Sequence, residues 1–309
     1  MLHVLKRWTV MLTRATPLPE FARRAAWTMF LLGVFGAIPG LAQYSRPKDP
    51  PGKGALTAEF VKTGLYMFSG PGGNSLLRLS ANGLIIVDGQ LPGNYDELLA
   101  QVKKISDQPV RVLIDTDYHE NHTGSNAKFL ADHTQILAQE NVKQDLAAYN
   151  PPHGKVAPPT KTYDHDLTLR LGGIEAQVLH YGNAHTNGDT VVYFPNLKVV
   201  AVGDLFAATP DPDFLAGGSL VGWGPVLGEI LKLDFDVVVP GTGPFVTRAD
   251  LEEFKTKIDT LVSRATLLVN KGVPKDQLMA QLKTDDLGWQ LNFTGDRLDG
   301  FYAELSRAK

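Results

Sequence analysis

The chain has 309 residues, of which 43% are hydrophobic and 20% charged, a composition that suits a folded protein with a substantial buried core. Its 30 lysines and arginines against 33 aspartates and glutamates give a formal net charge of -3, which argues against nucleic acid as an electrostatically captured partner. The absence of cysteine excludes disulfides, thiolate metal ligands and a cysteine nucleophile.

The first 42 residues predict an export signal. Arg23 and Arg24 end a basic segment that precedes an apolar run at 25–37, and Ala42 closes a stretch of small residues that a signal peptidase can cut. An uncleaved membrane anchor is the alternative, but glycine and proline interrupt the run, which is shorter than the ~20 residues that a spanning helix needs. We therefore expect cleavage near Ala42 and a periplasmic or secreted protein without stable membrane insertion.

Turn residues and apolar periodicity predict two strand-rich halves, each followed by helices. After an extended lead-in at 43–63, we expect a single domain over 64–309. Its first half should contain strands at 65–68, 75–79 and 83–88, a helix at 95–105, a strand at 110–114, a helix at 125–132, a strand at 135–138 and a helix at 141–149. After a proline-rich loop at 150–160, its second half should contain strands at 167–171, 176–180, 190–194, 198–202 and 235–239, the last strand, and helices from 248.

The polar segment 116–124 follows a predicted buried strand and carries two histidines with metal-ligand spacing. In an extended segment the side chains at i and i+2 point the same way, so Asp117 and His119 can bind one ion. When the chain then turns into a helix, Asn121 and His122 swing toward an adjacent position. One short loop could therefore serve two neighbouring metal sites.

Two further candidate ligands lie downstream. His185 sits in a loop between two predicted strands, and Asp204 ends an apolar strand. A buried carboxylate there needs a partner, which could be a cation or the backbone amides of a turn. His119 and His122 could likewise be polar loop residues that cap the following helix, and Asp117 could form hydrogen bonds within the loop. The spacing of the set favours metal ligands.

Four segments in the same order resemble motifs of the metallo-β-lactamase superfamily. They are 116–124, which is similar to T-H-x-H-x-D-H-x-G, 182–189, which is similar to A/G-H-T-x-G-D/S, 199–204, which is similar to the strand that ends in G-D, and 237–244, which is similar to P-G-H-G-P. The set is specific because order, spacing and strand-end placement agree. The resemblance implies an α+β fold, the αββα sandwich, and a hydrolase that uses a zinc-bound water on a small-molecule substrate.

The chain departs from this family pattern at three ligand positions. Asp117 replaces the first histidine, Asn121 the motif aspartate and Thr242 the last histidine. Since aspartate can bind zinc, Asp117, His119 and His185 could form one site with an open fourth position.

The other site keeps only His122 and Asp204 as good ligands. A carboxamide oxygen and a threonine hydroxyl are weak zinc ligands, so we expect one tightly bound ion. Asn121 can orient a water molecule but cannot take a proton from it.

Other residues are expected around the ligands. By the resemblance, Asp88 orders the ligand loops, and Thr242 and His180 are expected to support the site without binding the metal. Three aromatic residues near the predicted mouth could line a substrate cleft, although core packing is the alternative for the last of them. They are Tyr118, Phe206 and Trp223.

The replaced ligands also allow a rival hypothesis. In it, the chain is a catalytically silent relative that keeps the fold in order to bind a ligand or partner. A third interpretation, a di-iron oxidoreductase, needs the carboxylate and histidine positions that are changed here.

Overall fold

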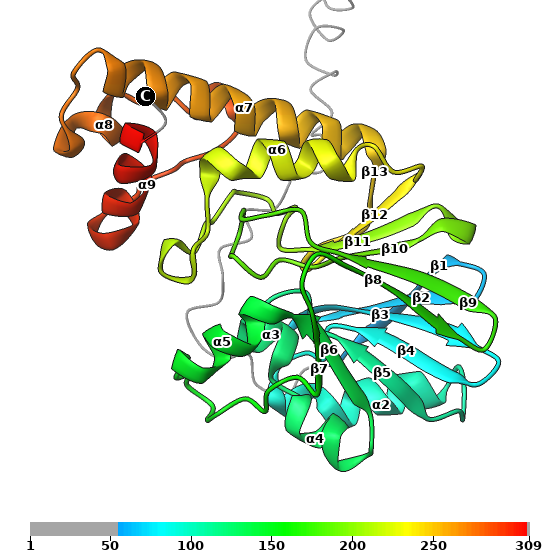
Figure 1. Ribbon diagram of the computed structural model, residues 1–309. Helices are drawn as coiled ribbons and strands as arrows, with labels where there is room; N and C mark the ends of the chain where they lie inside the picture. The colour runs from blue at the N-terminus through cyan, green and yellow to red at the C-terminus, as the bar shows by residue number, and fades with distance from the viewer. Residues whose placement is uncertain (1–54, 308–309) are drawn as a thin grey trace, which may run out of the picture. The chain divides into compact units, whose positions relative to one another are not determined.

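The computed structural model describes residues 55–307 (Figure 1). The predicted export signal at 1–42, and the lead-in up to residue 54, lie outside the described residues. The described residues belong to one compact unit, Arg46–Lys309. Within 55–307, no helix is long and apolar enough to cross a membrane.

The first sheet has seven strands that follow one another in chain order, antiparallel from β1 to β4 and parallel from β4 to β7. They are β1 (Thr57–Lys62), β2 (Leu65–Gly70), β3 (Gly73–Ser80), β4 (Gly83–Val87), β5 (Val110–Ile114), β6 (Gln135–Gln139) and β7 (Lys161–Tyr163). Gly83 has a φ of +129° at the turn into β4, and a Cβ there would collide with Arg111. Glycine is therefore needed where β3 and β4 join.

The second sheet has six strands in the order β13-β12-β11-β10-β9-β8, and only β11 and β12 are parallel. They are β8 (Asp166–Leu171), β9 (Ile174–Leu179), β10 (Val191–Phe194), β11 (Val199–Gly203), β12 (Val237–Pro240) and β13 (Val246–Thr247). Both sheets are thus mixed, as the expected fold requires.

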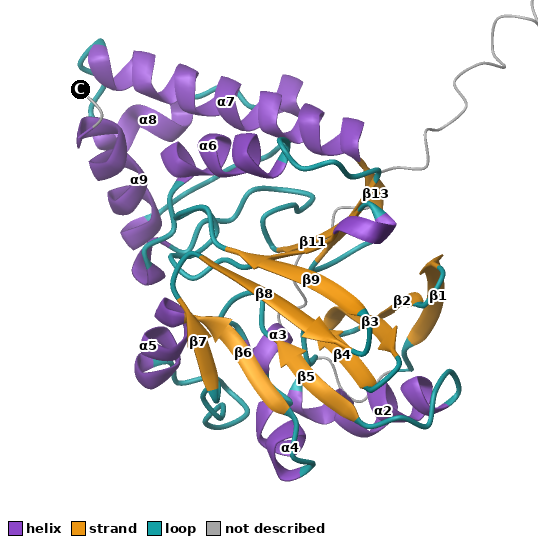
Figure 2. Cartoon of the chain, turned by 45° about the vertical axis from the view of Figure 1, so that its right-hand side comes forward, coloured by secondary structure: helices purple, strands orange, loops and turns teal. Residues whose placement is uncertain are grey.

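Helices cover the outer face of each sheet (Figures 1 and 2). The described helices are α2 (Tyr95–Lys103), α3 (Glu120–Thr123), α4 (Asn126–Ala131), α5 (Glu140–Ala148), α6 (Leu220–Ile230), α7 (Arg248–Asn270), α8 (Lys275–Gln281) and α9 (Gly295–Arg307). Short 3₁₀ turns occur at η1 (Pro92–Asn94), η2 (Pro195–Leu197), η3 (Phe214–Ala216) and η4 (Asp285–Leu287). Both views place α2 and α4 on the first sheet and α6 and α7 on the second, which confirms the expected αββα sandwich.

Three apolar layers hold this sandwich together. The middle layer lies between the sheets, where alternate residues of both point inward, as Ile85 and Ile114 do from the first and Val192 and Phe194 from the second. A second layer joins the first sheet to α2 and α4. The third joins the second sheet to α6 through α9 and contains the fully buried Trp223.

Besides the single-turn α3 and the short 3₁₀ turns, the sequence did not reveal four of these elements. The strand β1 occupies part of the expected lead-in. It was missed because most of its residues are exposed and give no alternating apolar pattern. The two- and three-residue strands β13 and β7 are too short to be recognised, and β13 means that 235–239 is not the last strand. Helix α6 contains several glycines and Pro225, which disfavour a helix in isolation. Packing on the sheet and on α7 stabilises α6 instead.

We predict that Trp223→Ala lowers the free energy of unfolding by about 3–5 kcal/mol, because it leaves a large cavity under α6. Leu267→Ala on α7 is the control, since Leu267 is 54% exposed and its truncation should change stability by less than about 0.5 kcal/mol. Urea denaturation measures both. Equal stability of the two variants would contradict this account of the third layer.

Candidate metal centre

The ligand loop begins directly after β5, and its first carboxylate shapes it. Oδ1 of Asp117 accepts a hydrogen bond from the backbone N–H of His119 at 2.7 Å, and His119 then caps α3. The helix therefore begins at Glu120, before the expected turn at Gly124, and it carries Asn121 and His122 in its single turn. Oδ1 of the buried Asp117 is thus bound to the backbone of the loop, and Oδ2 takes no part in this hydrogen bond.

Three expected ligands form a first set: Asp117, His119 and His185, with one donor atom each, all within 4.8 Å of one another. Nδ1 of His119 lies 3.0 Å from Oδ1 of Asp117 and 3.3 Å from Nε2 of His185. Nε2 of His185 is 3.5 Å from Oδ2 of Asp117. Ligand atoms around a tetrahedral zinc ion are about 3.4 Å apart when each zinc–ligand bond is about 2.0–2.1 Å. The first set therefore has suitable spacing for such an ion.

A second set consists of Asp117, His122 and Asp204. Nε2 of His122 lies 3.5 Å from Oδ2 of Asp117 and 3.5 Å from Oδ2 of Asp204. The side-chain nitrogen of Asn121 is also 2.8 Å from Nε2 of His122. Because Asp117 belongs to both sets, the two sets share a carboxylate.

Two observations test whether these residues fit a metal ion. Oδ2 of Asp117 is buried and accepts no hydrogen bond, a costly arrangement for a carboxylate unless a cation faces it. In addition, a Cβ at Gly241 would overlap Oδ1 of Asp204 and lie 2.9 Å from Cε1 of His122, so the chain passes close to the ligands where only glycine fits. Carboxylates and imidazoles together suit zinc. The residues of the two ligand sets therefore fit a zinc ion.

Asp88 holds His122 from behind. Its Oδ1 accepts hydrogen bonds from the backbone N–H of Thr116 at 2.8 Å and from the Thr116 hydroxyl at 2.9 Å. Its Oδ2 is 3.0 Å from Nδ1 of His122, which leaves Nε2 of that ring directed at the second set. Burial lowers the pKa of His122, but the charges of Asp117, Asp88 and Asp204 outweigh burial and hold that pKa well above its usual range.

The loop that carries His185 is fixed by its own hydrogen bonds. The Asp189 carboxylate accepts hydrogen bonds from the backbone N–H and the hydroxyl of Thr186, and burial raises the pKa of Asp189 to about 8. Nδ1 of His180 lies 2.8 Å from the carbonyl oxygen of Asp189. His180 thus contacts the backbone of this loop and belongs to neither ligand set.

Sequence reasoning missed Asp213, which contacts two residues of the ligand loop. Its Oδ2 accepts a hydrogen bond from the Tyr118 hydroxyl and lies 3.3 Å from Nε2 of His119. Burial raises the pKa of Asp213, but the hydrogen bonds from His119 and Tyr118 outweigh burial and hold that pKa below its usual range. Asp213 is 94 positions from His119 along the chain, so no local spacing could have indicated the contact.

The three expected cleft residues lie in different surroundings. The Tyr118 ring stacks at a tilt on His119, with 4.2 Å between ring centroids, and Phe206 is half-buried against Phe254. Trp223 does not line a cleft. It is fully buried, and its indole N–H donates a hydrogen bond to the carbonyl oxygen of Leu205. The indole N–H of Trp223 thus has the hydrogen-bond partner that a buried tryptophan needs, and Trp223 is a core residue.

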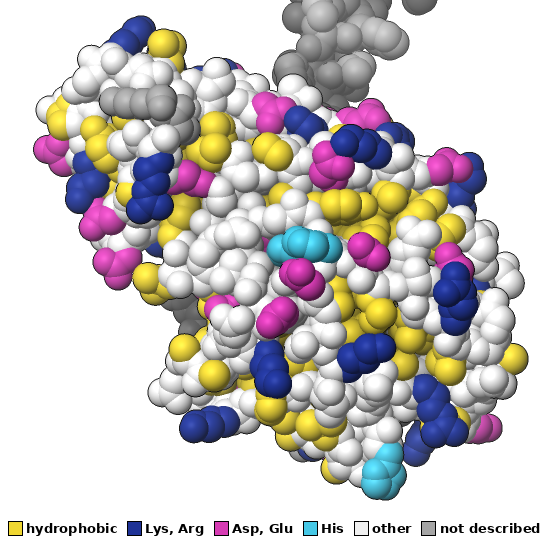
Figure 3. Space-filling model, viewed as in Figure 1, with side chains coloured by type: hydrophobic (Ala, Val, Ile, Leu, Met, Phe, Trp, Pro, Cys, Tyr) yellow, Lys and Arg dark blue, Asp and Glu magenta, His cyan; other side chains and the backbone are white. Residues whose placement is uncertain are grey.

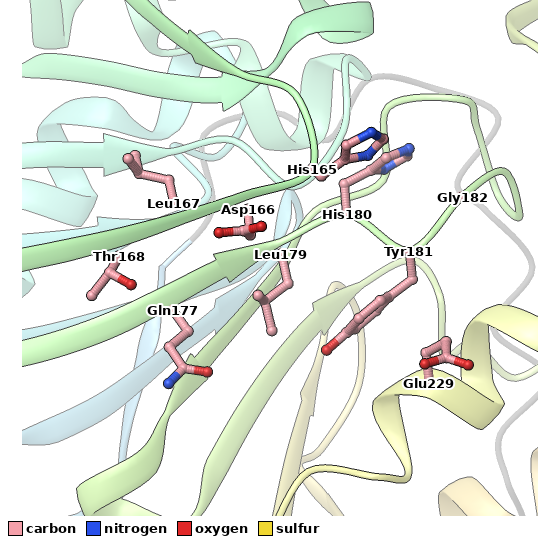
Figure 4. A pocket seen from close by; sticks show the side chains of 10 residues that line it. All are labelled: His165, Asp166, Leu167, Thr168, Gln177, Leu179, His180, Tyr181, Gly182 and Glu229. Carbon is pink, nitrogen blue, oxygen red and sulfur yellow. The ribbon is translucent and has the colours of Figure 1, made fainter.

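A cavity of about 700 Å³ opens elsewhere, on the outer face of β8 and β9 (Figure 4). Gln177, Leu179 and Tyr181 point into it from β9 and the segment after β9, and Glu229 reaches it from α6. On the molecular face in Figure 3, hydrophobic side chains gather between the helix layer and these strands, while acidic and basic side chains are interspersed. No residue of either ligand set lines the cavity, so it is distinct from the metal centre.

The fold and the histidine–aspartate cluster together define a hydrolase-like protein with a candidate metal centre between two sheets. Residues 70–242, more than half of the chain, match the family model described as the metallo-beta-lactamase superfamily, and the chain belongs to this superfamily. The resemblance seen in the four motifs is thereby confirmed.

The proteins that this chain is similar to include enzymes of different kinds. A 2,4-dinitroanisole O-demethylase subunit alpha from Nocardioides sp. (strain JS1661) is 30% identical over 62% of this chain and 56% of that subunit. A linear primary-alkylsulfatase from Pseudomonas sp. (strain ATCC 19151) is 24% identical over 65% of this chain and 48% of the enzyme. The chain thus spans about half the length of these relatives. A solved metallo-beta-lactamase from Pontibacter korlensis shares the fold with a TM-score of 0.58, at 20% identity over 66% of this chain and 99% of that chain.

We predict that Gly241→Ala weakens metal binding, because the added methyl group would displace Asp204 or His122 of the second set, and Nε2 of His122 lies 3.5 Å from the Asp117 carboxylate that both sets share. Isothermal titration of the metal-free protein with zinc should show a loss of affinity of at least about tenfold, the scale seen when ligand positioning is disturbed. Gly228→Ala is the matched control, since a Cβ at Gly228 meets only the flexible end of Lys255. Unchanged affinity in Gly241→Ala would show that this close approach is not needed for binding.

Proposed function

We propose that this protein is an exported metal-dependent hydrolase that holds one tightly bound zinc ion at Asp117, His119 and His185. The observation that carries the proposal is the approach of His119 and His185 to the buried Asp117 carboxylate, whose Oδ2 lies 3.5 Å from Nε2 of His185 and accepts no hydrogen bond. Both ligand sets need Asp117, and the Asn121 amide lies against Nε2 of His122. These two features favour the first set as the tight site.

When bound, zinc polarises a substrate oxygen and lowers the pKa of a coordinated water to ~7. The protein's own groups must then position and move protons. Asn121 can orient a water molecule through its carboxamide but cannot accept a proton. Asp145 on α5 is a carboxyl whose pKa is raised to about 6 by burial and then by the nearby charge of Asp213.

The substrate is proposed only as a small molecule with a bond open to hydrolysis. The names of these relatives refer to an aryl methyl ether, an alkyl sulfate and β-lactams, which have different reacting bonds. One scaffold therefore serves several chemistries, and the fold does not choose among them.

A catalytically silent binding protein is the second candidate. The observation that favours it is the set of changed positions, Asp117, Asn121 and Thr242, and above all the Asn121 amide 2.8 Å from Nε2 of His122. In that arrangement the Asn121 side chain occupies the position in front of the ring nitrogen that a metal ion would need.

We predict that the metal-free protein takes up one tightly held zinc ion per chain after equilibration with micromolar zinc and desalting. His185→Ala should lose that ion and any hydrolysis of a panel of 4-nitrophenyl esters, β-lactams and sulfate esters, since it removes one of three ligands. His165→Ala is the control, because His165 is exposed on the surface. Elemental analysis and initial rates measure the outcome.

Two tightly retained zinc ions would overturn the single-site proposal. Hydrolysis that survives replacement of both His119 and His185 by alanine would overturn the metal mechanism, and ligand binding without hydrolysis would favour the silent relative.

We also propose that residues 1–42 direct export, from the basic segment, the interrupted apolar run and the small residues before Ala42. Expression of the full chain in a Gram-negative host should give a soluble periplasmic protein whose N-terminus, read by mass spectrometry, lies close to Gln43. An intact N-terminus in the membrane fraction would instead support an anchor.

A further inference from the structure

The segment from Asp211 to Asp213 contacts both histidines of the first ligand set. The carbonyl oxygen of Asp211 lies 2.7 Å from Nδ1 of His185, and the carboxylate of Asp213 lies 3.3 Å from Nε2 of His119. The backbone N–H of Asp213 also donates to the carbonyl oxygen of His185 at 2.7 Å. Two residues of one loop thus contact two histidine rings that come from distant parts of the chain.

The two rings present different nitrogens to the centre. His119 directs Nδ1 toward Asp117 and His185, whereas His185 directs Nε2 toward Asp117. In a neutral imidazole one ring nitrogen carries hydrogen and the other a lone pair, and a metal ion needs the lone pair. Each ring in this site therefore has to keep its hydrogen on the nitrogen that faces the 211–213 segment.

We propose that this segment is a positioning element that selects which ring nitrogen His119 and His185 present to the metal, with Asp213 setting the tautomer of His119. The inference rests on the proposed zinc site. A carboxylate can only accept hydrogen bonds, so Asp213 favours hydrogen on Nε2 of His119 and lets Nδ1, which lies 3.0 Å from Oδ1 of Asp117, present its lone pair when a metal ion binds. The Asp211 carbonyl has the same effect on Nδ1 of His185, whose Nε2 can then present its lone pair to the metal.

The segment is itself held at both ends. Oδ1 of Asp213 accepts hydrogen bonds from the backbone N–H groups of Leu215 and Ala216, and the Asp213 carbonyl accepts one from Gly218. On the other side the Asp211 carboxylate forms an ion pair with Arg297 of α9. Helix α9 lies beyond residue 242, where the match to the family model ends. The C-terminal helix therefore braces a loop that touches the metal ligands.

The variant Asp213→Asn tests the proposal with little change in shape. Its Oδ1 can still cap η3, but its NH₂ group would face Nε2 of His119 and donate a hydrogen bond, which favours the opposite tautomer. Zinc affinity, measured by chelator competition, should fall by about 10–100-fold. ¹⁵N NMR of the imidazoles in the metal-free proteins should show that Nε2 of His119 carries hydrogen in the natural protein and has lost it in the variant, with His185 unchanged.

Tyr118→Phe is the control variant, because it removes the other hydrogen bond to Oδ2 of Asp213 and leaves the contact with His119 in place. Its zinc affinity should stay within about threefold of the natural protein, well below the effect of losing a ligand-orienting contact.

Unchanged zinc affinity or an unchanged His119 tautomer in Asp213→Asn would overturn the proposal, and so would equal losses in Asp213→Asn and Tyr118→Phe. If the natural protein binds no zinc, the proposed function fails first, and the tautomers of the metal-free natural protein still decide the positioning role. An Nε2 of His119 without hydrogen there would overturn it, and hydrogen on Nε2 that is lost in Asp213→Asn would support it.

Discussion

The burial of Asp117 among three histidines is the constraint on which the site depends. A carboxylate removed from water is costly unless positive charge faces it, and here Nε2 of His122 and Nε2 of His185 each lie 3.5 Å from its Oδ2. Burial raises the pKa of Asp117, but the charges of His122, His119 and His185 outweigh burial and hold that pKa well below its usual range. In the metal-free protein His122, whose pKa is held well above its usual range, thus supplies positive charge beside Asp117, and a metal ion bound by His122 must displace that proton.

The sandwich fold brings the candidate ligands together. Asp117, His185 and Asp204 follow the ends of strands that belong to two different sheets, and the loops meet where the sheets face each other. Around them lies a shell of fixed hydrogen bonds, in which Asp88 holds His122 and the 211–213 segment holds His119 and His185. Ligand orientation in such sites depends on these outer contacts nearly as much as on the ligands.

The sequence predicted the parts of this site that depend on local spacing. Asp117 and His119 are two residues apart after a buried strand, and His185 and Asp204 each follow a later strand. The resemblance to the family motifs therefore identified all four as candidate ligands. The contact of Asp213 with His119 could not be predicted, because it joins loops 94 residues apart and follows no motif. Helix α6 was also missed, since its glycines and proline hide a helix that tertiary packing stabilises.

The most direct test of this account is a crystal structure of the zinc-loaded protein with anomalous data collected at the zinc edge. The account predicts one strong anomalous peak, within about 2.0–2.2 Å of a carboxylate oxygen of Asp117, Nδ1 of His119 and Nε2 of His185. A peak bound only by His122 and Asp204, or no zinc within the cluster at all, would contradict it.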